Sequence, residues 1–491
     1  MHDKNVDPET TPKPRWKRRR MMGLAALVFH ILGFFSSIHA VMTNRTAQGA
    51  IAWGVSLNTF PYLAVPMYWV FGRRKFEGYV ESFQERQKDV NDLATRVRAA
   101  LDPYEVQSLE RLPNYEALQK IAQTPLLRGN DVELLIDGER TFDSVIDGLS
   151  RAQSYALVQF YIVRDDGLGR RLKSAMLDCV KRGVDVFFLY DEIGSIDLPR
   201  AYLDELEAAG VSYSRFHSTQ GSRNRFQLNF RNHRKSVIID GLESWIGGHN
   251  VGDEYLGLDP EVGPWRDTHV HITGPAAQLA QLLFLADWYW ATRTTPDWQW
   301  EPQPAPNGAD VMAMVVPISP VSDLEAAQLF FVHALNAASD RIWIATPYFV
   351  PDPAIMTALR LAALRGVDVR VIVPDKSDNP VVDFATLWFM EQLDGVGIRF
   401  YRHVPGFMHQ KVFLVDDYVS TVGSTNFDNR SFRLQFEVNA LFVNEAFASE
   451  IETMLLADLE HSEPYDPSSL HQASFLKRLA VSVARLTSPL L

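Results

Sequence analysis

The chain has 491 residues, enough for two to four ordinary domains with a substantial core. Its single cysteine, Cys179, excludes an internal disulfide and a cysteine zinc site and fits a reducing compartment. Residues 1–79 carry eleven Lys and Arg against four Asp and Glu, or +7, so a net charge of −12 leaves −19 for the rest. So acidic a body lacks the basic surface of a nucleic-acid-binding protein, and we expect no nucleic-acid partner.

Two apolar runs follow a basic N-terminal tail. Residues 1–20 hold seven Lys and Arg, residues 21–42 carry no formal charge, and a second apolar run spans about 49–72. Each run is about long enough to cross a bilayer, and basic residues flank the outer end of both. We therefore predict a two-helix transmembrane hairpin over residues 21–75 with both ends cytoplasmic, the tail 1–20 included. The alternatives are a buried helical hairpin and, less favoured because no small-residue cleavage site is obvious, a signal peptide.

The rest of the chain reads as a linker and two similar α/β halves. Residues 76–125 are charged and helix-compatible, and we expect a helical linker near the membrane surface. A strand–helix–strand pattern over 156–190 returns over 342–373, and Arg-Gly-Val-Asp-Val occurs in both, at 182–186 and 365–369. We predict an α/β fold with halves at 126–310 and 311–491, each with a largely parallel sheet covered by helices on both faces.

One polar motif occurs in both halves with the same spacing. It reads H-x-K, four residues, D, six residues, G-[GS]-x-N, and its members are His233, Lys235, Asp240 and Asn250 in the first half and His409, Lys411, Asp416 and Asn426 in the second. In a strand, the His and Lys point the same way, and an imidazole beside a cation suits an anionic phosphate. The two asparagines offer amide donors to the phosphate. The two aspartates have the opposite parity, so we interpret them as members of the catalytic motif that hold loop backbone.

This doubled H-x-K-x4-D motif resembles the signature of the phospholipase D superfamily. The stretch GSTNFDNRSFRLQFEVN is more narrowly similar to bacterial cardiolipin synthases, and RTAQGAIAWGVSL…FGRRK resembles the membrane anchor at their front. One departure is Gly248-His249, where the superfamily more often has Ser and a small residue. The resemblance implies a multi-pass protein of the bacterial inner membrane with a cytoplasmic catalytic domain.

A carboxylate lies about 30 residues beyond each motif histidine, at Asp267 and Glu437. A carboxylate that accepts from imidazole Nδ1 fixes the tautomer and leaves Nε2 to react. In the superfamily, residues in these places orient the histidines. We assign Asp267 to His233 and Glu437 to His409. The alternative for Asp267 is a pairing with Arg266 or a strand cap.

Two histidines and two lysines around one phosphate predict a covalent double displacement without metal or cofactor. Chemistry alone does not say which histidine attacks; the resemblance implies His233 as nucleophile and His409 as acid and base. Transfer of a phosphatidyl group between two phosphatidylglycerol molecules would give cardiolipin and glycerol, and the membrane anchor favours this reaction. Phospholipase D-type hydrolysis and transfer to another alcohol are the alternatives. A nuclease is disfavoured by charge, and a non-catalytic scaffold by the two intact motifs. The oligomeric state stays open.

Two further features have open interpretations. His269 and His271 could form a metal-binding pair on one strand face. No third ligand lies at a spacing typical of a metal site, and we expect no bound metal. The tail over 475–486 alternates basic and apolar residues at helical spacing. It predicts an amphipathic helix that either docks on the core or lies at the membrane interface.

Overall fold

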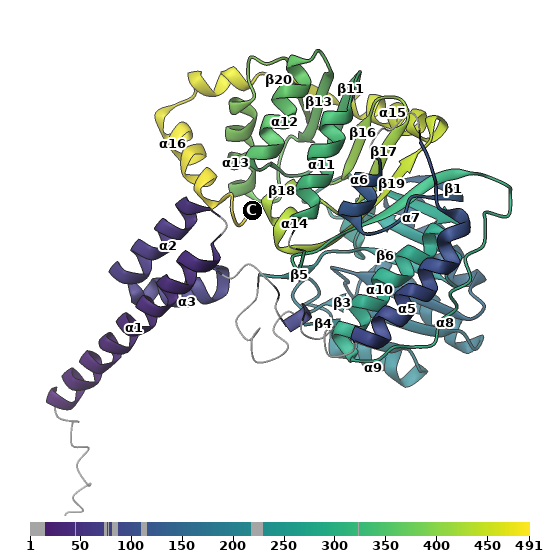
Figure 1. Ribbon diagram of the computed structural model, residues 1–491, viewed down its shortest axis with the longest axis horizontal. Coiled ribbons are helices and arrows are strands. Elements are labelled where there is room, and N and C mark those ends of the chain that lie inside the picture. Colours follow the sequence, from purple (N-terminus) through teal and green to yellow (C-terminus); the bar gives the residue numbers. More distant parts are fainter. Residues whose placement is uncertain are drawn as a thin grey trace, which may run out of the picture. The chain divides into compact units, whose positions relative to one another are not determined.

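The computed structural model describes residues 15–44, 46–72, 76, 78–80, 87–109, 115–217, 229–322 and 324–491. The chain divides into two compact units (Figure 1). The N-terminal unit takes in residues 1–75 and 223–229, and the second unit takes in 76–222 and 230–491.

The N-terminal unit contains α1 (Arg15–Thr43), α2 (Ala47–Thr59) and α3 (Pro61–Phe71). Within the described residues, α1 is the one helix long and apolar enough to cross a membrane, over Arg19–Thr43. The second apolar run is broken because Pro61 has no N–H to donate and keeps the preceding Phe60 out of helical conformation. The predicted two-span hairpin is therefore not confirmed.

The helix α2 runs back along α1. Its Leu57 carbonyl lies so close to Gly33 of α1 that a Cβ there would sit 2.2 Å from the oxygen. Leu57, near the end of α2, thus lies well inside α1, whereas the short connection after Thr43 joins the start of α2 to the end of α1. Glycine permits this close approach of two backbones.

The helix α3 then returns beside both. The Tyr62 ring at its start packs on Phe29, with centroids 5.6 Å apart, and the Tyr68 hydroxyl near its end lies 2.6 Å from Nδ1 of His39. Because Tyr62 contacts Phe29 and the later Tyr68 contacts the later His39, α3 runs in the same direction as α1. The chain therefore reaches Gly72 near the end of α1 from which α2 departs.

The second unit is built from two halves with matching helices. The helices of the first half are α7 (Asp137–Arg151), α8 (Gly167–Lys181), α9 (Arg200–Ala209) and α10 (Ala276–Thr292), with η2 (Asp253–Leu256). Their counterparts in the second half are α11 (Ala326–Ala337), α12 (Pro353–Leu364), α13 (Pro380–Gln392) and α15 (Glu445–Glu460). The second half also has α14 (Asn429–Arg433), η3 (Pro467–Gln472), α16 (Phe475–Ala484) and η4 (Arg485–Thr487).

The strands match in the same way. Those of the first half are β1 (Leu127–Ile136), β2 (Tyr155–Phe160), β3 (Asp185–Asp191), β4 (Ser212–Phe216), β5 (Arg231–Asn232), β6 (Ser236–Ile239), β7 (Glu243–Gly247), β8 (Trp265–Arg266) and β9 (Thr268–Thr273). Those of the second half are β10 (Val311–Ile318), β11 (Arg341–Ala345), β12 (Phe349–Val350), β13 (Asp368–Pro374), β14 (Arg399–His403), β15 (Phe407–Met408), β16 (Val412–Val415), β17 (Val419–Gly423), β18 (Phe427–Asp428), β19 (Gln435–Val443) and β20 (Ser462–Tyr465).

One 16-stranded sheet runs through both halves. Its order is β20-β14-β13-β11-β16-β17-β19-β10-β1-β9-β7-β6-β2-β3-β4, with β5 beside β19, so the halves join at the antiparallel pair β1–β10. In this sheet, β2–β3–β4 and β11–β13–β14 are parallel, as is the short pair β5–β19, and the other neighbouring strands are antiparallel. The prediction of a largely parallel sheet is therefore wrong. The tight turns after β6 and β16 return the chain at once, which forces antiparallel pairing.

Helices cover both faces of the sheet, as predicted. Alternate residues of β2 enter different cores: Val158 packs with α7, α8 and α9, while Leu157 packs with α10. In the second half, Ile344 packs with α11 and α12, and Trp343 packs in the core that contains α15. That core also contains residues of α10, so the two halves share buried apolar surface.

Residues 76–125 contain α5 (Gln87–Leu101), η1 (Asp102–Tyr104) and α6 (Tyr115–Ala122). The predicted helices are present, but they pack on the body. Val97 and Leu101 are buried in the core shared by both halves, and Leu118 is buried in that of the second half. This segment is therefore part of the second unit.

Candidate active site

Both H-x-K motifs lie in extended segments immediately before a strand. His233 and Lys235 connect β5 to β6, and His409 and Lys411 connect β15 to β16. All four residues are buried, each histidine with 7% of its surface exposed. The backbone N–H of His233 donates to Phe436 O at 2.8 Å. Similarly, the N–H of His409 donates to Arg266 O at 2.7 Å, so each motif is bonded to the other half of the chain.

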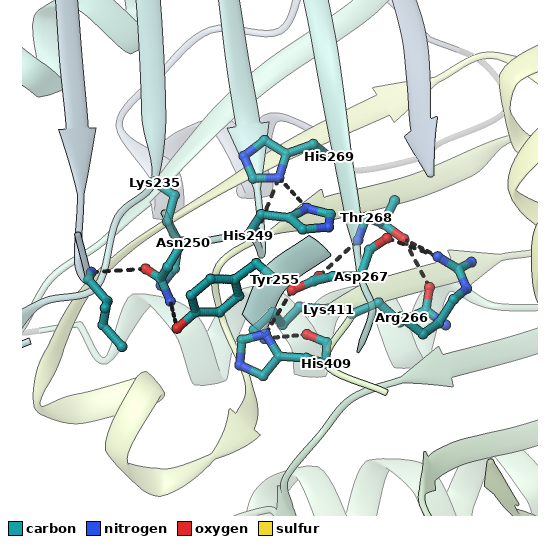
Figure 2. A network of polar contacts seen from close by, with 12 residues as sticks. Lys235, His249, Asn250, Tyr255, Arg266, Asp267, Thr268, His269, His409 and Lys411 are labelled. Carbon is teal, nitrogen blue, oxygen red and sulfur yellow. Dashed lines mark hydrogen bonds and ion pairs between the residues drawn. The ribbon is translucent and has the colours of Figure 1, made fainter. Parts of the chain in front are cut away.

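Each histidine is oriented by a carboxylate from the opposite half. Nδ1 of His233 lies 2.9 and 3.0 Å from the two oxygens of Glu437, and Nδ1 of His409 lies 2.7 Å from Oδ2 of Asp267. The predicted pairing within each half is therefore wrong. Figure 2 shows the Asp267–His409 contact.

Short strand pairs between the halves cause this exchange. The strand β5 lies parallel to β19, with Asn232 opposite Phe436, and β15 lies parallel to β8, with Met408 opposite Arg266. The next residue along each strand is then a histidine on one side and a carboxylate on the other. Arg266 donates to the backbone oxygen of Asp267 and forms its ion pairs elsewhere, so a pairing of the two side chains is not supported. Oδ1 of Asp267 does accept the N–H of Thr268 at 2.8 Å, so Asp267 caps the start of β9 as well as contacting His409.

The two lysines make the same contact, each with the backbone carbonyl of the histidine in its own motif. Nζ of Lys235 donates to the carbonyl of His233 at 2.6 Å, and Nζ of Lys411 donates to the carbonyl of His409. Nζ of Lys411 also lies 2.8 Å from Nδ1 of His409. Burial lowers the pKa of both ammonium groups, that of Lys411 to about 8. A buried ammonium held this way is available to a bound phosphate anion.

The histidines form one electrostatic cluster with both lysines. Burial is the main cause that lowers the pKa of both imidazoles, that of His409 to about 4. Lys411 contributes to the lowering at His233, and Lys235 contributes to that at His409. The charge of each lysine therefore lowers the pKa of the histidine in the other motif, as expected for a single site.

The pKa values of the two carboxyl groups are shifted in opposite directions. Burial raises the pKa of Glu437 to about 8, although Lys235 opposes the shift. Burial also acts to raise the pKa of Asp267, but Lys411 and the neighbouring imidazoles outweigh it and hold the pKa well below its usual value. His409 thus faces a carboxylate that stays ionised, whereas the carboxyl group facing His233 takes up a proton more readily.

The structure explains why the first motif has Gly248 where the second has Ser424. In the second half, the Ser424 hydroxyl donates to Oε2 of Glu437 at 2.5 Å. At the matching position of the first half, a Cβ on Gly248 would lie 2.1 Å from Oδ1 of Asp267. Glycine is therefore required there because the aspartate carboxylate fills the space a side chain would occupy.

The middle residue of each H-x-K motif is anchored to a buried aspartate that the sequence analysis missed. Arg234 donates to Asp287 of α10 at 2.6 Å. Gln410 donates to Asp458 of α15 at 2.7 Å, and Arg266 of the other half also binds Asp458, at 2.6 and 3.0 Å. A signal was present, because Leu-Ala-Asp occurs at the end of both helices, at 285–287 and 456–458.

Asp240 and Asp416 hold loop backbone, as interpreted from their parity. Asp240 accepts the N–H groups of residues 153, 154 and 155, each at 2.8 Å. Asp416 accepts those of residues 339, 340 and 341 at 2.8–3.2 Å. Both residues adopt positive φ, of 52° and 53°. Each aspartate thus fixes the turn that leads into β2 or β11.

The two motif asparagines differ. The amide oxygen of Asn250 accepts the N–H of Ile162 at 3.1 Å, and its nitrogen donates to the Tyr255 hydroxyl at 3.2 Å (Figure 2). The side-chain oxygen of Asn426 is buried and has no hydrogen-bond partner. Asn250 therefore supports the loop in this structure, and Asn426 is the better placed of the two to adjust to a ligand.

His269 and His271 are not partners of each other. Nδ1 of His269 lies 3.1 Å from Nδ1 of His249, while Nε2 of His271 lies 2.8 Å from Glu243 and its ring stacks on Trp245 at 4.2 Å. Among the described residues, no three His, Cys, Asp or Glu side chains are grouped to hold a metal ion.

Comparison with known proteins agrees with this geometry. A family model described as "Cardiolipin synthase, PLD-like domain" matches residues 145–288 and 331–459, one segment in each half. The chain belongs to this family. Cardiolipin synthase A of Pseudomonas aeruginosa (strain LESB58) is 46% identical over 476 residues, which cover 96% of each chain. Cardiolipin synthase A of Pseudomonas putida (strain W619) is 44% identical over 94% of this chain and 97% of its own.

A solved structure also shares the fold. The crystal structure of phosphatidylserine synthase from Haemophilus influenzae Rd KW20 has a TM-score of 0.59 and 14% sequence identity, and covers 77% of this chain and 99% of its own. At that identity the match supports the arrangement of the two halves and nothing finer.

Replacing Asp416 by Asn should destabilise the protein and leave its chemistry largely intact. The amide keeps one oxygen for the N–H groups of residues 340 and 341, but its NH₂ replaces the oxygen that accepts from Ser339 and the negative charge is lost, which costs about 1–3 kcal/mol. We expect a lower midpoint of thermal unfolding and near-normal turnover per folded molecule. The exposed neighbour is the matched control, and Asp417→Asn should leave the midpoint unchanged. A folded Asp416→Asn protein without turnover would show a direct catalytic role.

The rate should fall on the alkaline side as Lys411 loses its proton. Its pKa of about 8 means that a rise in pH through that value removes a positive charge that a phosphodiester needs. Because kcat/KM reports the free enzyme, its profile should turn down near pH 8, while kcat should turn down at higher pH once the bound anion retains the proton. A profile of kcat/KM that stays flat to pH 9.5 would contradict the assignment.

Proposed function

We propose that the protein transfers the phosphatidyl group of one phosphatidylglycerol to the headgroup hydroxyl of another, giving cardiolipin and glycerol. The observation that supports this most is one buried site with two oriented histidines and two lysines, in a chain 46% identical over 96% of its length to a cardiolipin synthase A. The substrates are membrane phospholipids, and no metal or cofactor enters the reaction. We propose no oligomeric state.

In the first step, Nε2 of His233 attacks phosphorus. The bond from phosphorus to the headgroup glycerol breaks, and the glycerol oxygen takes a proton from Nε2 of His409. The pKa of His233, lowered by burial, suits a neutral nucleophile. Burial and Lys411 also lower the pKa of His409, to about 4, so the protonated acid that this step needs depends on the ionised Asp267 and on the negative charge of the bound phosphodiester, both of which raise that pKa. Lys235 and Lys411 hold the non-bridging oxygens, with Asn426 as a further donor.

In the second step, the headgroup hydroxyl of another phosphatidylglycerol enters. His409, now neutral, takes the hydroxyl proton, the new phosphorus–oxygen bond forms and the phosphorus–nitrogen bond to His233 breaks. One phosphodiester replaces another, so the phosphohistidine conserves the energy of the bond. Water or another alcohol in the same position would give the alternative activities, phospholipase D-type hydrolysis or transphosphatidylation.

The products of the purified protein test this function directly. Incubation with phosphatidylglycerol and analysis of the lipids by mass should show cardiolipin, with free glycerol in equal amount. Phosphatidic acid as the main product would establish hydrolysis instead. Adding ethanol distinguishes acceptor preferences, because phosphatidylethanol would form if small alcohols compete. Exhaustive chelation should leave the rate unchanged.

A labelling experiment should distinguish the roles of the two histidines. His409→Ala should cripple turnover of phosphatidylglycerol, yet still load phosphate onto His233 from a substrate with a low-pKa leaving group. General acid help is typically worth about 10²–10⁴-fold, and a good leaving group makes much of it unnecessary. His233→Ala should neither turn over nor label. The reverse pattern would exchange the two roles, and substantial activity in both variants would refute the shared site.

We also propose that α1 anchors the protein in the bacterial inner membrane. Its apolar window is only 17% buried, and its N-terminal end is basic. Because α2 turns back and α3 returns, the chain leaves this unit at the end of α1 near residue 44. One crossing by α1 then places its basic N-terminal end and Asn44 on opposite sides of the membrane.

Accessibility labelling can check this topology. Labels at Asn44 and after Leu491 should react from the same side of the membrane, and a label at the N-terminus should react from the other. A label at Asn44 accessible only from outside, with the catalytic unit and N-terminus both cytoplasmic, would instead support two full spans and the topology expected from the sequence.

A further inference from the structure

The helix α16, near the end of the chain, exposes an apolar face. It packs beside α13 (Figure 1), and only Val481 and Ala484 of its ten residues are buried. Five large apolar side chains of α16 and the following turn are 47–74% exposed: Phe475, Leu476, Leu479, Val483 and Leu486. Docking on the core, one of the two predicted alternatives, therefore uses only a narrow strip of small residues.

The exposed apolar side chains share one side of the helix. At 3.6 residues per turn they fall within an arc of about 100°, and the buried Val481 and Ala484 lie on roughly the opposite side. Side chains scattered by chance would not leave one continuous apolar stripe facing away from the body. Five residues of this size are more than the scattered exposed hydrophobics of an ordinary surface.

The charge of the segment is positive in an acidic protein. Residues 475–491 contain Lys477, Arg478 and Arg485 and no Asp or Glu, whereas residues 80–491 together carry −19. Arg478 and Arg485 lie beside the apolar stripe, and Arg485 stacks on Trp388 of α13 at 4.5 Å. An apolar stripe bordered by cations complements the headgroup and acyl boundary of an anionic bilayer.

The segment also connects to the active site. After α16 the chain ends at α14, where the N–H of Arg430 donates to Leu491 O at 2.7 Å and its guanidinium donates to Leu490 O at 3.3 Å. The charge of Arg430 contributes to the lowered pKa of His233, after burial and the two lysines. The helix is thus tied to the loop that follows Asn426.

We propose that α16 inserts its apolar face into the interface of an anionic phospholipid bilayer and thereby holds the catalytic unit against its lipid substrate. This rests on the proposed function, since it supplies that site with membrane-resident substrate. The occupant is the lipid surface, because the stripe combines exposed apolar area with positive charge only. A second copy of this chain would carry the same positive charge on this face.

A single-cysteine label measures insertion without reference to activity. The only native cysteine, Cys179, is buried and can be replaced by Ser. Leu479→Cys then carries an environment-sensitive dye in the full-length protein, reconstituted in vesicles of phosphatidylcholine and phosphatidylglycerol. Leu364→Cys on α12, 71% exposed, is the matched control. We expect a blue-shifted dye at 479, quenched by brominated acyl chains, and a dye at 364 quenched by aqueous iodide.

Two outcomes would overturn the proposal. A dye at 479 as open to iodide as the control shows that α16 does not insert. A blue-shifted dye that brominated lipid does not quench shows that protein covers the face, whether another copy or another segment of this chain.

Acidic substitutions on the apolar face test the consequence for catalysis. Leu476→Glu with Leu479→Glu should lower kcat/KM on vesicle phosphatidylglycerol by about tenfold or more, because burial of even one leucine is worth that much. Labelling of His233 by a soluble phosphodiester with a good leaving group should be unchanged, as should all activities of Leu364→Glu. Unchanged vesicle activity in the double variant would contradict the proposal. If the dye inserts but no cardiolipin forms, the proposed function fails and the membrane contact stands.

Discussion

The exchange of carboxylates between the halves is the constraint on which the site depends. His233 reaches Glu437 and His409 reaches Asp267, so neither half contains an oriented histidine by itself. The short parallel pairs β5–β19 and β8–β15 bring these residues together. Arg266 then binds Asp458 across the same boundary, and Arg234 donates to the backbone oxygen of Glu437 at 3.1 Å. Association of the halves and assembly of the site are therefore one event.

Burial of so many charges needs compensation. Two ammonium groups, two imidazoles and two carboxyl groups lie in one desolvated cluster, and isolated charges there would cost several kcal/mol each. The shifted pKa values are the response: Lys411 moves to about 8 and Glu437 to about 8. A phosphodiester anion between the lysines would complete the pairing. The same burial that costs stability in the empty protein thus favours binding of the substrate anion.

Much of this organisation could be predicted from the sequence. The repeated motif located the histidines and lysines that gather in the buried site, the repeated Arg-Gly-Val-Asp-Val marked equivalent strands, and strand parity assigned Asp240 and Asp416 to the loop backbone. The pairing of His233 with Glu437 could not be predicted, because it depends on strand contacts between residues about 200 positions apart. Distance along the chain from motif to carboxylate suggested the opposite pairing.

Two other differences between prediction and structure have local causes. The second apolar run was long enough to span a bilayer, but hydropathy does not register the backbone break at Phe60–Pro61. The sheet was expected to be largely parallel because strands alternate with helices, whereas short turns after β6 and β16 make hairpins in both halves. In each case the signal was present in the residues, a proline in one and a Gly or Asp turn in the other.

The most direct test of the exchanged pairing is a cycle of variants assayed for labelling of His233 by a soluble phosphodiester with a good leaving group. In the His409→Ala protein, Asp267 has lost the imidazole it orients, so adding Asp267→Asn should not lower the labelling rate further. Adding Glu437→Gln to the same protein should lower it, because Glu437 still orients His233, the proposed nucleophile. If instead Asp267→Asn slows labelling of His409→Ala and Glu437→Gln does not, each carboxylate serves the histidine of its own half and the account is wrong.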